Sequence, residues 1–115
     1  MAKVEISSGL KNEILKKFKE ESKKIFKLMF SLKENPKKGK PIGNIKGILI
    51  KELKYKSFRF YFITDSFKLR ILSVDELNEL LIRFVRMSNK KNQQKVINEI
   101  KNVLKKVGKE ALEEE

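Results

Sequence analysis

The chain has 115 residues, enough for one domain with its own core, and its 40% hydrophobic and 37% charged residues are typical of a soluble globular protein. Lysine and arginine number 28 against 15 acidic residues, and the net charge of +13 favours a polyanionic partner: nucleic acid, an anionic membrane or an acidic protein. Cysteine and histidine are absent, which excludes thiolate nucleophiles, Ser-His relays and the common zinc sites. The sequence lacks a membrane-length apolar run and a signal-peptide pattern, so we expect a cytoplasmic protein.

The first third of the chain predicts a strand followed by helix. Residues 3–7 alternate in polarity, which predicts a strand. Over residues 8–34 apolar side chains recur at helical spacing, but a polar stretch interrupts them, so the segment is one helix or a hairpin of two helices broken near Glu21 or Ser22. Asn35-Pro36 ends the helical pattern, and the glycines and proline that follow, up to Gly47, predict an extended basic loop.

The middle of the chain predicts β-structure. Residues 47–54 and 58–64 are rich in Ile, Leu and Phe and are separated by a short connection, which predicts an antiparallel pair. Asp65-Ser66 predicts a turn into a further strand over residues 67–73, followed by a helical turn over 74–79 and a last strand over 80–87.

The C-terminal part predicts one amphipathic helix, capped by Ser88 or Asn89 and ended by Gly108. Its apolar stripe, which must pack on the chain's own sheet or on a partner, consists of Val96, Ile97, Ile100, Val103, Leu104 and Val107. The expected fold class is therefore α+β: a small antiparallel twisted sheet with an N-terminal helix or helical hairpin and this C-terminal helix. We expect a single domain over residues 1–108 and an acidic tail over 109–115.

Alternation in the two central strands predicts which side chains share a face of the sheet. Phe58, Phe60 and Phe62 face the core, so Arg59 and Tyr61 face the other side, where Glu52 and Lys54 of the neighbouring strand can join them. Cations that neutralise phosphates beside an aromatic ring are typical of RNA recognition, although structural ion pairs of Glu52 with Lys54 or Arg59 explain part of the pattern equally well. Arg83 and Arg86 lie on opposite faces of the last strand unless a bulge intervenes.

The order of these segments resembles the RelE/ParE toxin superfamily, and its HigB-like, phage-related branch most closely. The resemblance spans about residues 3–104 and rests on short motifs: Asn35-Pro36-Lys37-Lys38-Gly39, Gly47, Glu52-Leu53-Lys54, Phe58-Arg59-Phe60-Tyr61, Lys90-Lys91-Asn92-Gln93-Gln94-Lys95 and Glu99-Ile100. Where the branch often carries His-Gly, this chain has Arg86-Met87, and Lys54 replaces the arginine of the family's Glu-Leu-Arg triplet.

The resemblance implies the toxin of a type II toxin–antitoxin pair, a metal-independent endoribonuclease without cofactors that cleaves messenger RNA, usually on the ribosome. In such toxins the ribose 2′-hydroxyl attacks the adjacent phosphate. By this resemblance Arg59 stabilises the transition-state charge, Lys54 or Lys56 is the base if neighbouring cations lower its pKa, and Arg86 assists the leaving group. The residues expected to bind RNA are Lys51, Tyr61, Lys90, Lys91 and Lys95.

Two other functions are compatible with the same residues: a non-catalytic inhibitor of DNA gyrase like the ParE members, and a basic RNA-binding domain without activity. The expected partners are messenger RNA, the ribosome and a cognate acidic antitoxin, with no membrane contact. The oligomeric state stays open.

Overall fold

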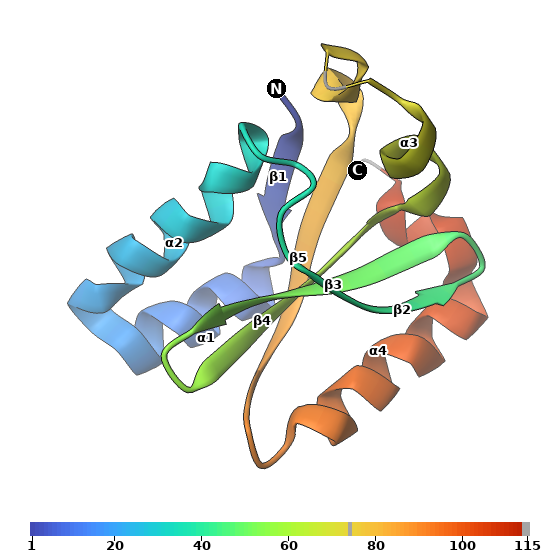
Figure 1. Cartoon of the computed structure of the whole chain (residues 1–115). Coiled ribbons are helices and arrows are strands. Elements are labelled where there is room, and N and C mark those ends of the chain that lie inside the picture. Colours follow the sequence, from blue (N-terminus) through green and yellow to red (C-terminus); the bar gives the residue numbers. More distant parts are fainter. Residues whose placement is uncertain (74, 114–115) are drawn as a thin grey trace.

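The computed structural model describes residues 1–73 and 75–113, which form an α+β fold around one sheet (Figure 1). The strands are β1 (Lys3–Ile6), β2 (Lys40–Ile45), β3 (Ile48–Tyr55), β4 (Phe58–Asp65) and β5 (Leu81–Asn89), in the spatial order β1-β5-β4-β3-β2. The helices are α1 (Ser8–Phe18), α2 (Ser22–Phe30), α3 (Ser66–Ile71) and α4 (Gln93–Val107), with short 3-10 helices between or after them.

The sheet is mixed, which corrects the expectation of an antiparallel one. Strands β2 to β5 pair antiparallel, but β1 pairs parallel with β5, as Val4 opposite Ile82 illustrates. This pairing joins segments almost 80 residues apart, and a parallel neighbour requires a long crossover that no local pattern announces.

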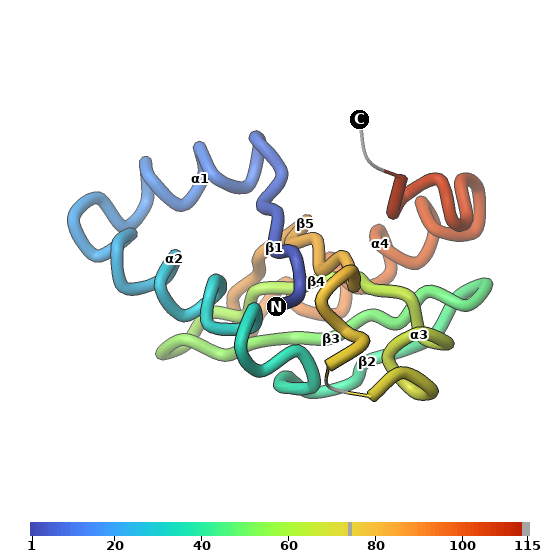
Figure 2. Tube along the Cα trace, turned by 90° about the horizontal axis from the view of Figure 1, so that it is seen from above, coloured from blue at the N-terminus to red at the C-terminus, as the bar shows by residue number. Residues whose placement is uncertain are grey.

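Helices cover both faces of the sheet, and each face has its own core (Figure 2). The first core joins α1 and α2 to Phe60 and Phe62, as the strand alternation predicts, and also to Phe84. The second core joins α4 to the opposite face and consists of Ile48, Ile50, Tyr61, Ile63, Val96, Ile97, Ile100 and Leu104. Most of the apolar stripe of the last helix therefore packs on the chain's own sheet, whereas Val103 and Val107 stay exposed.

The N-terminal helical segment is a hairpin. Helix α1 ends at Phe18 because Lys19 adopts a left-handed conformation with φ 51°, and α2 starts at Ser22 after one 3-10 turn. The buried Ser22 hydroxyl donates to the carbonyl of Ile14 at 3.1 Å, which fastens the second helix to the first. The break thus begins two residues before the predicted position.

Two segments differ from their predicted structure. Residues 40–45, expected as a loop, form β2 at the sheet edge, where a bulge between Pro41 and Gly43 accommodates the proline. Helix α3 occupies most of the strand expected over residues 67–73, because the Asp65 carboxylate caps the helix by accepting from the Lys68 backbone N–H at 3.0 Å. The expected helical turn is present as Asp75–Glu79, and Val74 lies outside the described residues.

The start of the last helix also differs. Strand β5 continues to Asn89, so neither Ser88 nor Asn89 caps α4, which begins after Asn92. Asn89 and Asn92 instead exchange two hydrogen bonds between side chain and backbone across the turn.

Helix α4 ends at Gly108, as predicted, where φ is 57°. The chain continues as a 3-10 helix, Gly108–Leu112, in which Ala111 and Leu112 pack on the second core. Most of the expected acidic tail is therefore folded against the domain. No helix within the described ranges is long and apolar enough to cross a bilayer.

We predict that Gly39→Ala destabilises the fold by about 1–3 kcal/mol, because Gly39 has φ +107° and an added Cβ would lie 2.7 Å from Cζ of Phe62. The matched control is Gly9→Ala in α1, where a Cβ meets nothing within 4 Å, and stability should stay or rise by up to about 1 kcal/mol. Urea denaturation measures both variants. Equal effects at the two positions would contradict the close approach at Gly39.

Candidate functional site

A groove of about 520 Å³ opens at the sheet edge where β2 begins. Strand β2 pairs with β3 only as far as Lys40 opposite Glu52, whereas β3 continues to Tyr55. The groove therefore forms beside the uncovered end of β3, and it is lined by Leu28, Lys38, Gly39, Lys40, Glu52, Leu53, Lys54, Arg59 and Gln93. Four cations and one carboxylate converge there from the loop before β2 and from three strands, and the start of α4 adds the amide of Gln93.

Strand register determines which of these side chains are neighbours. Directly opposed residues share a face of the sheet, and in this sheet Lys54 opposes Arg59 while Glu52 opposes Tyr61. On its other side Glu52 opposes Lys40 of β2. Glu52 is thus next to one lysine and diagonal to Arg59, on the face that the alternation predicts.

Arg59 and Glu52 are both buried, yet they do not pair with each other. Arg59 is 9% exposed, and its Nη1 donates a long hydrogen bond of 3.4 Å to the carbonyl of Ser57. Glu52 is 7% exposed, and its Oε2 is the buried side-chain oxygen or nitrogen without a hydrogen-bond partner in the described part of the chain. The interpretation of Glu52 as a structural ion-pair partner is therefore wrong, and the groove holds unused donors and an unused acceptor.

Tyr61 does not belong to the accessible site, contrary to its expected role in RNA binding. Its ring is fully buried in the second core, and its hydroxyl shares a hydrogen bond of 2.8 Å with Oγ of Ser88. Burial raises the pKa of Tyr61. Alternation correctly gives the face of this ring, but α4 covers that face, so the ring cannot stack on a base.

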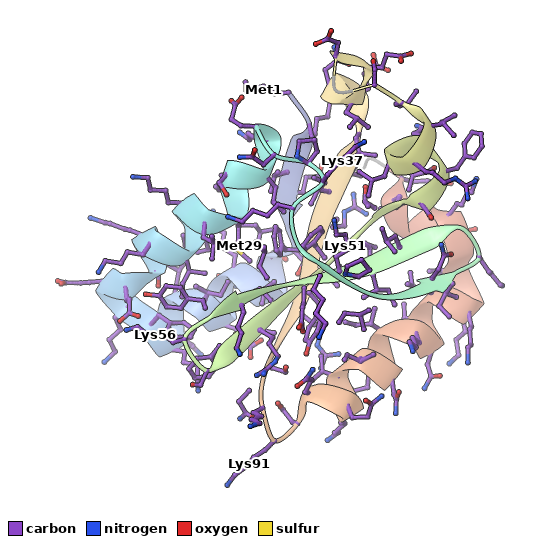
Figure 3. All side chains as sticks on the ribbon, viewed as in Figure 1. Met1, Met29, Lys37, Lys51, Lys56 and Lys91 are labelled. Carbon is purple, nitrogen blue, oxygen red and sulfur yellow. The ribbon has the colours of Figure 1, made fainter. Side chains whose placement is uncertain are left out.

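Lys51 lies on the opposite face of the sheet, which corrects its assignment as an RNA contact. It is 3% exposed, and its Nζ donates to the carbonyl of Lys37 at 2.8 Å and lies 5.9 Å from the centre of the Phe62 ring (Figure 3). Burial lowers the pKa of Lys51. This lysine fastens the loop that carries Lys38 to the sheet.

Lys56 is bound away from the groove, at the tip of the β3–β4 hairpin (Figure 3). Its Nζ lies 2.8 Å from Oε2 of Glu21, and the Tyr55 hydroxyl donates to the same oxygen at 2.6 Å. The hydrogen bond with Glu21 raises the pKa of Lys56. A general base would need a lowered pKa, so this environment does not favour the expected catalytic role of Lys56.

Arg86 faces α4 because β5 contains a bulge. Tyr61 opposes Arg86 whereas Phe62 opposes Phe84, so one extra residue, Val85, brings Arg83 and Arg86 to the same face. The Arg86 guanidinium pairs with Oε2 of Glu99 at 2.8 Å. It lines a separate apolar groove of about 230 Å³ rather than the groove of Arg59. The structure therefore does not place it beside Arg59 as a free charge donor.

The remaining predicted lysines surround the start of α4. Lys90 and Lys91 lie in the turn before this helix and Lys95 in its first turn, and all three are exposed; Lys91 points into solvent (Figure 3). Gln93, which follows Lys91 by two residues and Lys90 by three, lines the groove. These lysines extend the positive surface from the groove along one end of α4.

Sequence reasoning missed Lys38, Lys40 and Gln93, and it gave Glu52 a structural role. The signal for the first two was the basic run Lys37-Lys38-Gly39-Lys40, but interpreting residues 40–45 as loop hid their position beside β3. The groove as built suits anions with several phosphate oxygens, which lysine and arginine can neutralise. Within residues 1–73 and 75–113 no three acidic side chains gather as a metal-binding group.

Comparison of this chain with protein-family models, with curated proteins and with solved structures finds no match.

The contact between Tyr55 and Glu21 at the hairpin tip predicts how the pKa of Tyr55 responds to mutation. Its hydrogen bond to Glu21 raises the pKa of Tyr55 above its ordinary value of 10.0, so Glu21→Gln should move this ionisation to lower pH. Ultraviolet absorbance titration measures it, with Tyr55→Phe used to subtract Tyr61. Glu20→Gln is the charge-matched control and should leave Tyr55 unchanged. An unmoved titration in Glu21→Gln would contradict the contact.

The same contact predicts a change of stability in acid. The hydrogen bond with Lys56 lowers the pKa of Glu21 below 4.5, so its contribution is present above that pH and is lost as pH falls through the lowered pKa. Glu21→Gln should therefore lose less stability than the wild type between neutral and acidic pH, as measured by urea denaturation.

Proposed function

We propose that this protein is the toxin of a type II toxin–antitoxin pair and a metal-independent endoribonuclease that cleaves messenger RNA on the ribosome. The observation that carries the proposal is the buried Arg59, whose guanidinium lacks an acidic partner at close range and lines a groove with Lys38, Lys40 and Lys54. A buried cation without such a partner is costly for a domain of this size, and an anionic substrate would offset that cost.

The family resemblance supports the same groove. Glu52-Leu53-Lys54 and Phe58-Arg59 are separate motifs in the sequence, but antiparallel pairing makes Lys54 and Arg59 direct neighbours. The α+β fold with a helical hairpin and a C-terminal helix is compatible with the expectation from that resemblance, apart from the parallel β1.

Binding in this groove would rely on the RNA backbone. The four cations of the groove can contact the reacting phosphate, and Lys90, Lys91 and Lys95 are positioned for flanking phosphates at the start of α4. Because Tyr61 is buried, base stacking on it is not part of the proposal. Affinity should therefore depend strongly on salt and weakly on sequence.

Cleavage would proceed by attack of the 2′-oxygen on phosphorus with loss of its proton to the base, departure of the 5′-oxygen, which takes up a proton from water, and formation of a 2′,3′-cyclic phosphate. Negative charge develops on the non-bridging oxygens, and the planar guanidinium of Arg59 can donate two hydrogen bonds to them. Of the two lysines expected as the base, Lys54 lines the groove and Lys56 does not. Arg86 is paired with Glu99 and has no role in the proposed step.

We predict that Arg59→Lys lowers RNA cleavage and toxicity by on the order of a hundredfold or more, because lysine keeps the charge but loses the two-pronged geometry. This variant is preferable to Arg59→Ala, which would empty a buried position and remove the cation diagonal to Glu52. Lys56→Gln is the control, since that side chain is tied to Glu21, and it should cleave like the wild type. An active Arg59→Lys with an unchanged unfolding midpoint would remove the main support for the site.

Mapping of message ends after induced expression distinguishes the proposed function from its alternatives. Cuts that require translating ribosomes support the ribonuclease. DNA damage without cuts would identify a gyrase inhibitor, and RNA binding without cuts in any condition would identify an inactive RNA-binding domain.

The proposal includes an acidic antitoxin, for which the second groove offers a binding surface. This groove lies between β5 and α4, and its lining is almost wholly apolar: Ile63, Val85, Ile100, Val103, Leu104 and Ala111. Val103 is 56% exposed, and the ion pair of Arg86 with Glu99 lines the same groove. An amphipathic acidic segment would bury its apolar side chains there, and the net charge of +13 would speed its association.

We predict that Val103→Asp prevents a stable complex with the small acidic protein encoded by the neighbouring gene, because it places a charge in the apolar groove. RNA cleavage should be unchanged, since Val103 is remote from the lining of the Arg59 groove. Asn102→Asp introduces the same charge at the adjacent exposed position and should preserve the complex. Co-expression followed by size-exclusion chromatography measures this. A complex that survives Val103→Asp would place the partner elsewhere.

A further inference from the structure

Glu52 is an unusual component of a groove that would bind a polyanion. It contributes a negative charge next to phosphate-binding lysines, and nothing in the proposed cleavage step uses it. Its side chain is 7% exposed, and Oε2 is buried without a hydrogen-bond partner among the described residues. Such an oxygen destabilises a folded protein unless something donates a hydrogen bond to it.

The neighbours of Glu52 do not satisfy it. Lys40 opposes it on β2 and Tyr61 opposes it on β4, but the Tyr61 hydroxyl is engaged with Ser88. Arg59 is a diagonal neighbour on the same face, and no ion pair joins the two side chains. The Glu52 carboxylate and the cations around it therefore line the same groove without forming an ion pair.

A ligand that fits this arrangement must present an anion and a hydrogen-bond donor close together. The four cations would hold the anion, and the carboxylate would accept from the donor. A ribonucleotide does this with its phosphate and the adjacent 2′-hydroxyl, whereas a deoxyribonucleotide lacks the donor. The terminal torsion of a glutamate is broad, so a rotation of the carboxylate can bring an oxygen toward the groove.

We propose that Glu52 accepts a hydrogen bond from the ribose 2′-hydroxyl and makes the groove selective for RNA over DNA. This deepens the proposed function, because it concerns the substrate class of the same groove. Glu52 is a specificity residue in this proposal, and recognition of the sugar does not require that it also take the proton during cleavage.

The test compares the binding of a short single-stranded RNA with that of the same sequence in DNA with uracil bases, by fluorescence anisotropy with a check of strand integrity. The wild type should bind the RNA about tenfold more tightly, as expected for one hydrogen bond to a charged group. Glu52→Met keeps the length of the side chain but removes the acceptor, and it should bind the two strands equally. Glu52→Gln keeps a carbonyl acceptor and should retain part of the preference.

Removal of a negative charge strengthens binding to both strands, so the ratio of the two affinities is the measured quantity. Glu13→Gln, on the exposed side of α1, makes the same change of charge away from the groove and should leave the ratio unchanged. Thermal unfolding checks that each variant is folded.

The outcomes separate this inference from the proposed function. A wild-type preference for RNA that survives in Glu52→Met, or a wild type that binds RNA and DNA equally, overturns the role of Glu52 and leaves ribonuclease activity to be decided by the Arg59 variants. A wild type that binds neither strand overturns both proposals.

Discussion

The register of β3 against β4 is the constraint on which the site depends. A two-residue connection, Lys56 and Ser57, joins the strands, with Lys56 in a left-handed conformation at φ 54°. It places Lys54 opposite Arg59 and Glu52 opposite Tyr61. Because side chains alternate along a strand, a slip of one residue would exchange the phenylalanines of the first core with the charged residues of the groove. The contacts of Lys56 and Tyr55 with Glu21 help to hold the tip against the helical hairpin.

Two cores account for most of the sheet surface, and the groove occupies the part that neither core covers. The helical hairpin packs on one face and α4 on the other, while β2 stops at Lys40 and leaves the end of β3 open. The loop before β2 closes this side. It is held by the hydrogen bond that Lys51 donates to it and by the close approach of Gly39 to Phe62. Charged side chains can remain unpaired at this edge because the apolar burial elsewhere supplies the stability.

The sequence predicts the parts of the fold that short patterns encode. The alternation around Phe58, Phe60 and Phe62, the two-helix alternative and the end of α4 at Gly108 need only local information, and they agree with the structure. The parallel β1, the edge strand β2 and the bulge at Val85 depend on partners distant in the chain, which a single sequence does not reveal.

For the site, alternation gives the face of Tyr61, Glu52 and Lys51 but not how deeply each side chain is buried. The Tyr61 ring and the Lys51 side chain are buried, and only the Glu52 carboxylate lines a groove.

Arg83, which the bulge in β5 brings to the same face as Arg86, contacts segments near both ends of the chain. Its guanidinium donates to the carboxylate of Glu5 in β1 and to the carbonyls of Ala111 and Glu113 after α4. One side chain thus ties the first strand to the last described turn, and Ala111 in turn forms part of the wall of the apolar groove. Trimming of residues 111–113 would therefore free the Arg83 guanidinium from two of its three acceptors and remove one wall of the groove beside α4.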